Sequence, residues 1–151
     1  MNNVSMKLSE HFSLAEMCKT SANLDNVPNE AQVENLKRLC GWLEMLRSEW
    51  NKRYGEGNDP IIINSGFRSE AVNKAVGGVK GSNHLSGCAA DIRVAGIEQL
   101  VRYATILLDI SDESQEDFDE LLLERSPKGN YWLHFAVRPS GNRRKVRLIQ
   151  T

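Results

Sequence analysis

The sequence predicts one domain of the α+β class, in which a small antiparallel sheet is covered by helices. A chain of 151 residues forms a single domain and buries roughly 70% of the surface that its unfolded form exposes. Apolar residues recur every three or four positions early in the chain and alternate towards its end, periods typical of helices and of strands. Helices that precede strands indicate α+β. We expect one domain over 1–151, with a helical part over about 8–55 and a core over about 60–150.

A short helix is predicted near the N-terminus. Ser13 and Glu16 have the spacing of a capping box, in which the two side chains accept hydrogen bonds from backbone N–H groups at the start of a helix. We expect this helix to continue to about Lys19.

A long helix follows, beginning near Pro28, because proline is well suited to a first helical turn. Gly55 and Gly57 end it. A stripe of apolar side chains at intervals of three and four predicts one buried face. Trp42 lies outside this stripe, and we interpret it as packing against another segment. The stripe consists of Val33, Leu36, Leu39, Cys40, Leu43, Leu46, Trp50 and Tyr54.

The middle of the chain alternates between strands and helices. A short run of β-branched residues predicts a buried strand, and Ser69 can cap the helix that follows it, which Gly77 closes. A loop rich in glycine and serine then leads into a second apolar run. We expect strands over 61–63 and 89–94, and helices over 70–76 and 97–109.

The last part of the chain predicts strands. Pro127 and Gly129 are turn residues between two runs with alternating side chains. We expect strands over 118–124, 131–137 and 145–150. The arginine-rich run that begins at Arg138 is interpreted as a solvated turn and strand face.

Composition and charge exclude several classes of protein. A formal net charge of −1 gives no electrostatic attraction to nucleic acid or to anionic lipid. No apolar run approaches the ~20 residues of a membrane span, and the first residues lack the apolar stretch of a signal peptide. The three cysteines are scattered without a Cys-x-x-Cys pair, which argues against a disulfide framework and a zinc–thiolate site. We expect a monomer in the cytoplasm that binds no nucleic acid.

Two histidines and one aspartate form a candidate metal site. His84 lies in the small-residue loop, and Asp91 opens the apolar run after it. In the strand over 131–137, His134 shares a face with Trp132, away from the largest apolar side chains. If both strands belong to one sheet, two imidazoles and a carboxylate converge, a set that suits catalytic zinc or ferrous iron. The spacing is equally compatible with a structural histidine and an aspartate that binds a backbone amide.

The motifs around these residues resemble a known family. "SNHLSGCAAD" matches Ser-x-His-x-x-Gly-x-Ala-x-Asp, the metal motif of the zinc D-Ala-D-Ala carboxypeptidase and endopeptidase family, which has the Hedgehog/D-Ala-D-Ala-peptidase fold. "SGFRS", "VNKAVGG" and "YWLH" resemble further motifs of that family, in the same order. The segments "LSEHFSLAEM" and "NVPNEAQVENLKRL" are similar to its phage- and prophage-type branch. The resemblance covers about residues 8–137.

The resemblance implies a ligand set and a substrate class. Zn²⁺ would be held by His84, Asp91 and His134, and the substrate would be the stem peptide of peptidoglycan. Arg68 resembles the family arginine that stabilises the oxyanion or binds a substrate carboxylate, tasks that suit a guanidinium. Asn73 and Ser82 are expected near the site, and Cys88 is expected to pack away from the metal.

The general base is the point at which the sequence departs from the family pattern. Many relatives carry an acidic residue three positions before the third metal ligand, where this chain has Tyr131. The phage-type branch has an acidic residue at the end of the preceding strand, which corresponds to Glu124. Asp119 and Glu120 on the same strand are the competitors.

The register of the predicted hairpin decides whether Glu124 reaches the site, because a slip of one residue moves a side chain to the other face. A three-residue loop over 127–129 pairs Glu124 with Trp132, on the His134 face. A four-residue loop that begins at Ser126 pairs Glu124 with Tyr131 instead. We expect the first loop, because Gly129 suits a left-handed bulge position.

Three hypotheses follow. The first is a zinc peptidase that cleaves cell-wall peptide, as a carboxypeptidase or endopeptidase, and that is released from the cytoplasm by a holin if it is a phage endolysin. The second is a non-catalytic module that binds the cell wall or forms part of a phage particle. In such a module the metal would only stabilise the fold. The third is a metal-free domain.

Overall fold

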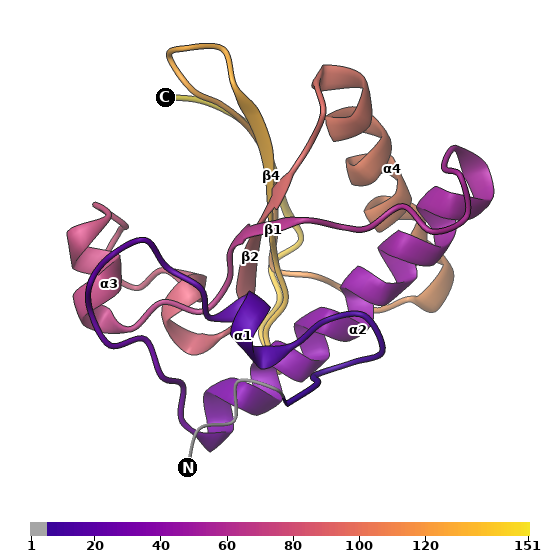
Figure 1. Ribbon diagram of the computed structural model, residues 1–151. Helices are drawn as coiled ribbons and strands as arrows, with labels where there is room; N and C mark the ends of the chain where they lie inside the picture. Colours follow the sequence, from indigo (N-terminus) through magenta and orange to yellow (C-terminus); the bar gives the residue numbers. More distant parts are fainter. Residues whose placement is uncertain (1–5) are drawn as a thin grey trace.

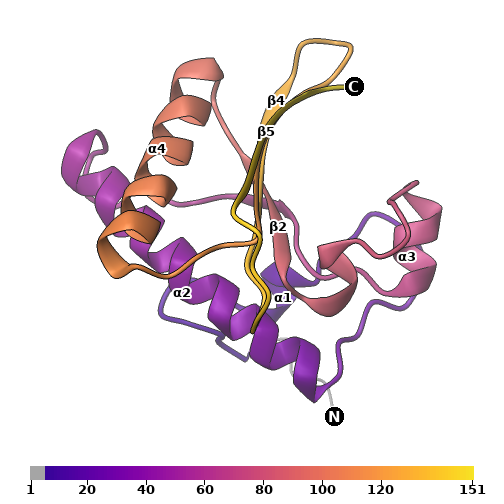
Figure 2. The same cartoon turned by 180° about the vertical axis from the view of Figure 1, so that it is seen from behind.

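The computed structural model describes residues 6–151 and has a five-stranded sheet with the order β1-β2-β4-β3-β5. Helices α2 and α4 lie on one side of this sheet and α3 lies on the other (Figures 1 and 2). The predicted α+β class is confirmed. The helices are α1 (Leu14–Met17), α2 (Glu30–Arg53), α3 (Glu70–Ala75), the 3-10 helix η1 (Asn83–Ser86) and α4 (Ile97–Ser114). The strands are β1 (Ile63–Ser65), β2 (Ala89–Arg93), β3 (Glu120–Arg125), β4 (Tyr131–Ala136) and β5 (Lys145–Gln150).

Side-chain caps mark where helices α1 and α2 begin. Ser13 Oγ accepts from the backbone N–H of Glu16 at 3.1 Å, which is the Ser13 half of the predicted capping box. The helix ends at Met17 rather than near Lys19. Helix α2 starts with a reciprocal capping box between Asn29 and Gln32, so its N-cap directly follows Pro28. Each cap satisfies N–H groups that have no partner within the helix.

The core lies between the sheet and helices α2 and α4. Helix α2 buries six of the eight residues of the predicted stripe together with Trp42. Val33 is only partly buried, and Tyr54, which follows the helix, is exposed. The Trp42 ring lies 5.4 Å from Phe135 on β4 and 6.4 Å from Phe118, measured between ring centroids. The interpretation of Trp42 as a packing residue is therefore confirmed, and it joins α2 to the inner face of the sheet.

The last strand differs from the prediction of an antiparallel sheet. Strand β4 pairs antiparallel with both β2 and β3, but β5 pairs parallel with β3. The chain turns at the end of β4 and returns on the far side of β3, so β5 is antiparallel to β4 without being its neighbour. The alternating pattern of 145–150 predicts a strand but contains nothing that selects its partner.

The hairpin between β3 and β4 has the register that a three-residue loop gives. Ser126 N donates to Asn130 O at 2.8 Å, and Gly129 has φ +85° in the left-handed region that favours glycine. Glu124 consequently lies opposite Trp132, and Leu122 lies opposite His134. The predicted loop is confirmed, and Glu124 shares a face of the sheet with His134.

The ends of one strand and one helix also differ from the prediction. Strand β1 begins at Ile63 rather than Ile61, because its pairing with β2 starts opposite Ile92. Helix α4 extends to Ser114, beyond its predicted end. Across residues 6–151, none of the helices has the length and apolar composition that crossing a membrane requires.

Candidate metal centre

The loop that carries His84 is held against the start of helix α2. Ser82 Oγ accepts from His84 N at 3.2 Å and begins η1. Gly87 ends η1 with φ +76°, and a Cβ at this position would lie 2.6 Å from Gln32 O. The small residues around His84 therefore allow the backbone to approach the helix closely, which fixes the imidazole in the interior.

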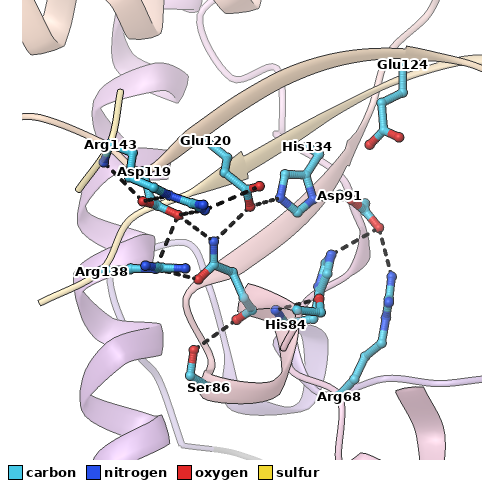
Figure 3. A network of polar contacts seen from close by, with 12 residues as sticks. Arg68, His84, Ser86, Asp91, Asp119, Glu120, Glu124, His134, Arg138 and Arg143 are labelled. Atoms are coloured by element: carbon cyan, nitrogen blue, oxygen red, sulfur yellow. Dashed lines mark hydrogen bonds and ion pairs between the residues drawn. The ribbon is translucent and has the colours of Figure 1, made fainter. Parts of the chain in front are cut away.

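Asp91 and His134 come from neighbouring strands. They are directly opposite each other in the β2–β4 pairing, so both side chains leave the sheet on the same face. His134 Nδ1 lies 3.1 Å from Asp91 Oδ1, and His84 Nε2 lies 3.4 Å from Asp91 Oδ2. One donor atom from each of the three residues lies within 4.8 Å of the others (Figure 3). The convergence predicted from the sequence is present.

In each imidazole, the nitrogen that points away from Asp91 already has a hydrogen-bond partner. The nitrogen that faces Asp91 is therefore the one that can bind a metal. His84 Nδ1 lies 2.6 Å from the Gly66 carbonyl oxygen, which can only accept, so His84 Nε2 is the nitrogen that faces Asp91. His134 Nε2 lies 2.9 Å from Glu120 Oε1, so His134 Nδ1 faces Asp91. Histidine ligands of metals typically donate their other N–H in this way. Two imidazole nitrogens and a carboxylate oxygen fit a zinc ion with one open position.

Arg68 lies beside this group rather than on the surface. Its Nη2 donates to Asp91 Oδ2 at 3.2 Å and its Nη1 donates to Asn73 Oδ1 at 3.1 Å. Its Nε donates to Ser65 Oγ at 3.1 Å. Asn73 therefore orients Arg68, while Ser82 caps η1 and acts on His84 through the backbone. A planar guanidinium fixed by three contacts presents its remaining N–H groups in a defined direction.

The three acidic residues of β3 and its entry have different surroundings. Asp119 is fully buried and forms salt bridges with Arg138 at 3.2 Å and Arg143 at 2.8 Å. Glu120 approaches His134 on the side away from Asp91. Glu124 lies on the opposite side of the His134–Asp91 pair from Glu120, with its carboxylate directed towards that pair (Figure 3).

The two arginines at Asp119 modify the interpretation of the run that begins at Arg138. Both guanidiniums are partly exposed, but each also contacts the fully buried Asp119 carboxylate. The run is therefore an anchor for the entry of β3 and more than a solvated face.

Glu124 has the surroundings of a proton acceptor. Burial raises the pKa of Glu124, and the negative charge of Asp91 raises it further. Its Oε2 accepts from Trp132 Nε1 at 3.1 Å, a bond to the residue directly opposite on β4. A carboxyl group with a raised pKa is closer to the operating pH of a general base.

The electrostatics of the metal-free triad favour a charged His134. Burial alone lowers the pKa of His134, but hydrogen bonds to Asp91 and Glu120 outweigh it and raise the pKa to about 9. Burial raises the pKa of Asp91, and the hydrogen bonds to His134 and His84 outweigh it, so this carboxyl ionises well below its usual range. A proton on His134 thus takes the position that a metal would occupy.

This arrangement predicts how the stability of the metal-free protein depends on pH. The pKa of His134 rises from its ordinary 6.5 to about 9, so its contribution to the free energy of unfolding is complete below pH 6.5 and is lost as the pH rises through 9. The hydrogen bond from His134 helps lower the pKa of Glu120 from 4.5 to about 2, so that contribution is lost as the pH falls through this range. We expect greatest stability between about pH 4.5 and 6.5.

Chemical unfolding of chelator-treated protein between pH 2 and pH 10 measures this dependence. A His134→Gln variant is the control, since it should lose the decline on the alkaline side. A metal-free protein whose stability is constant from pH 6.5 to pH 10 would show that His134 is neutral.

Cys88 packs away from the triad, as expected. It is buried, and its Sγ lies 3.9 Å from the Ser86 carbonyl oxygen. Within residues 6–151, the group of side chains close enough to share a metal consists of His84, Asp91 and His134, without a thiol. The set of donors is therefore that of an open site rather than of a closed structural one.

Some partners of the site have no signal in the sequence. The carbonyl of Gly66 that orients His84 is a backbone group and has no residue type to reveal it. Asn83, next to His84, contacts both Asp119 and Glu120, although its position in a small-residue loop indicates only a turn. The Glu120 contact has a weak signal in the sequence: with the predicted hairpin register, Glu120 lies on the same face of the sheet as His134.

The chain is similar to a known family and to a characterised enzyme. The family described as peptidase M15 matches residues 10–111, which include Arg68, His84 and Asp91 but not His134. The zinc D-Ala-D-Ala carboxypeptidase of Streptomyces albus G is 48% identical over 40 residues, which is 26% of this chain. The match spans 16% of the length of that relative.

Proposed function

Because this chain belongs to the peptidase M15 family, we propose that it is a zinc-dependent peptidase that hydrolyses the stem peptides of peptidoglycan. The observation that carries the proposal is the convergence of His84, Asp91 and His134 within 4.8 Å. The similarity to a zinc D-Ala-D-Ala carboxypeptidase of Streptomyces supports both the metal and the substrate class.

Zinc supplies two effects when bound at such a site: it lowers the pKa of a bound water towards ~7 and polarises the scissile carbonyl. The side chains of this chain do the rest. Glu124 is proposed to accept the proton of the attacking water at its free carboxylate oxygen, since Oε2 is held by Trp132. The same group can then return the proton to the leaving amine.

Arg68 is proposed to stabilise the negative charge that develops on the carbonyl oxygen. Its guanidinium lies beside Asp91 and retains N–H groups that are not used by Ser65, Asn73 or Asp91. Fixed donors at a developing oxyanion need no reorganisation during the reaction.

A cavity beside Arg68 has the charge expected of a binding site for an anionic group of the substrate. It has a volume of about 220 Å³, and Lys19 and Arg68 are its charged lining residues. Its lining contains no acidic residue, and Thr20, Ser21 and Ser65 add hydroxyl groups. A peptide carboxylate suits this environment, and stem peptides carry such groups.

The second hypothesis, a non-catalytic module, depends on Tyr131 in place of an acidic residue. Tyr131 packs against the apolar core, and it lies opposite Arg125 at the end of the hairpin. The tyrosine therefore belongs to the inner face of the sheet and does not itself indicate a lost base, because Glu124 is available on the outer face.

Digestion of purified muropeptides, followed by mass spectrometry, tests the proposal. The expected result is cleavage by zinc-loaded protein that stops on chelation and returns with zinc, together with about one zinc per chain. The mass of the products identifies the bond and so distinguishes carboxypeptidase from endopeptidase. Zinc without cleavage of any stem peptide would favour the non-catalytic module, and no zinc would favour the metal-free domain.

Arg68→Ala is expected to lower kcat/KM by about 10²–10³, the usual cost of removing one oxyanion donor. At saturating zinc the variant should still bind one ion per chain, because the three donors remain. Steady-state kinetics on the muropeptide measure the change. Arg102→Ala, which removes an arginine paired with Glu98 on α4, is the control, and equal activity of the two variants would exclude Arg68 from catalysis.

A further inference from the structure

Glu120 makes a contact that the proposed mechanism does not use. Its Oε1 lies 2.9 Å from His134 Nε2, on the outer side of the ring, while His134 Nδ1 is 3.1 Å from Asp91 Oδ1. Both the Glu120 and His134 side chains are largely buried. Glu120 therefore contacts the histidine from behind and is in the wrong place to act on a water or a substrate bound at Asp91.

The Glu120 carboxylate is itself held in one orientation. Asn83 Nδ2 donates to the same Oε1 at 2.8 Å and to Asp119 Oδ2 at 2.7 Å. The amide of Asn83 cannot be reversed without loss, because its Oδ1 accepts from Arg138 Nε at 2.9 Å. The oxygen at His134 is thus fixed as an acceptor by a network that ends on two arginines.

Asp119 anchors this network. Arg143 contacts both of its carboxylate oxygens, with Nη2 at 2.8 Å from Oδ2 and Nε at 3.0 Å from Oδ1. A bidentate pair of this kind is geometrically specific. Asp119 and Asn83 are buried, and the network connects the loop of His84 to the strand of His134.

We infer that Glu120 is a positioning residue, which holds the N–H of His134 at Nε2 and so presents Nδ1 to the metal. An imidazole has two tautomers, and only the one protonated at Nε2 leaves Nδ1 free to bind beside Asp91. A carboxylate that accepts from the outer nitrogen selects this tautomer, fixes the ring and raises the basicity of the ligand. The inference rests on the proposed zinc site and removes Glu120 as a competitor for the general base.

Zinc affinity, measured by competition with a chromophoric chelator, tests the role. Glu120→Ala is expected to weaken binding by about 10–100-fold, the usual effect of losing a partner behind a metal ligand. Glu120→Gln should keep most of the affinity, since its amide oxygen can accept from both His134 and Asn83. Glu124→Ala is the matched control, because it removes the same charge from the same strand without touching His134.

The tautomer itself is visible in the ¹⁵N NMR spectrum of the zinc-loaded, unmodified protein. The expected signature for His134 is a protonated Nε2 and a metal-bound Nδ1. This measurement does not depend on whether any variant folds. Zinc bound through Nε2 would overturn the inference outright.

The remaining outcomes separate the inference from the proposed function. If Glu120→Ala binds zinc as tightly as Glu124→Ala, or if Glu120→Gln is as weak as Glu120→Ala, the positioning role is wrong while the zinc peptidase stands. If the unmodified protein binds no zinc, both are wrong. If it binds zinc with the expected tautomer but cleaves no stem peptide, the inference stands and the proposed peptidase activity is wrong.

Discussion

His134→Ala is expected to weaken zinc binding by far more than 100-fold. Loss of a partner behind a ligand costs about 10–100-fold, and this substitution removes a ligand altogether. The two remaining donors, His84 and Asp91, are one imidazole and one carboxylate that already share contacts with Gly66 and Arg68. Two donors leave half of the tetrahedral positions to water.

The comparison with His11 makes this test specific. The chain has three histidines, and His11 contacts Glu44 at 2.7 Å and Arg47 at 2.9 Å on the N-terminal side of the molecule. His11→Ala should therefore bind zinc like the unmodified protein. Titration with zinc under chelator competition gives both affinities, and full occupancy of His134→Ala at submicromolar free zinc would refute the assignment of the ligand.

Local patterns predict only part of the candidate metal site, namely which side chains share a face of the sheet. The assignment of His84, Asp91 and His134 as zinc ligands rests on the resemblance to the peptidase family, because their spacing alone is also compatible with structural roles. Successive side chains of the strand that holds His134 point to opposite faces, and Leu133 and Phe135 occupy the face away from His134. Gly129 predicts the loop that brings Glu124 to the same face, and the pairing of Glu124 with Trp132 confirms it. Each of these steps depends on residues that are close in the chain.

The features that could not be predicted depend on contacts between distant segments. Strand β5 pairs with β3 rather than β4, and the strand pattern of 145–150 does not specify a neighbour. Glu120 and Glu124 carry the same functional group on the same strand, and only the position of His134 between them separates a positioning role from that of a base. Arg138 and Arg143 acquire their role from a buried aspartate whose burial is not visible in its residue type.

The largest effect on catalysis is expected at Glu124. Glu124→Gln should lower turnover by roughly 10²–10⁴, the usual contribution of a positioned general base. The amide has the same shape and can still accept from Trp132 Nε1, which is 3.1 Å from Oε2, but it cannot accept a proton from water. Zinc content and melting temperature should change little, because Glu124 is not a proposed ligand.

A control variant and two further measurements distinguish a loss of proton transfer in Glu124→Gln from a loss of folding or of zinc binding. Glu116→Gln, in an exposed position, controls for the loss of one negative charge and should keep full activity. Turnover, zinc content and melting temperature are measured on the same preparations. Full activity of Glu124→Gln would assign the proton transfer to another group, and Glu120 could take that role only if its contact with His134, 2.9 Å in the metal-free protein, is broken during the reaction. Because that contact also aligns a metal ligand, a base at Glu120 would have to weaken zinc binding in order to act, whereas Glu124 can accept a proton with the ligand set intact.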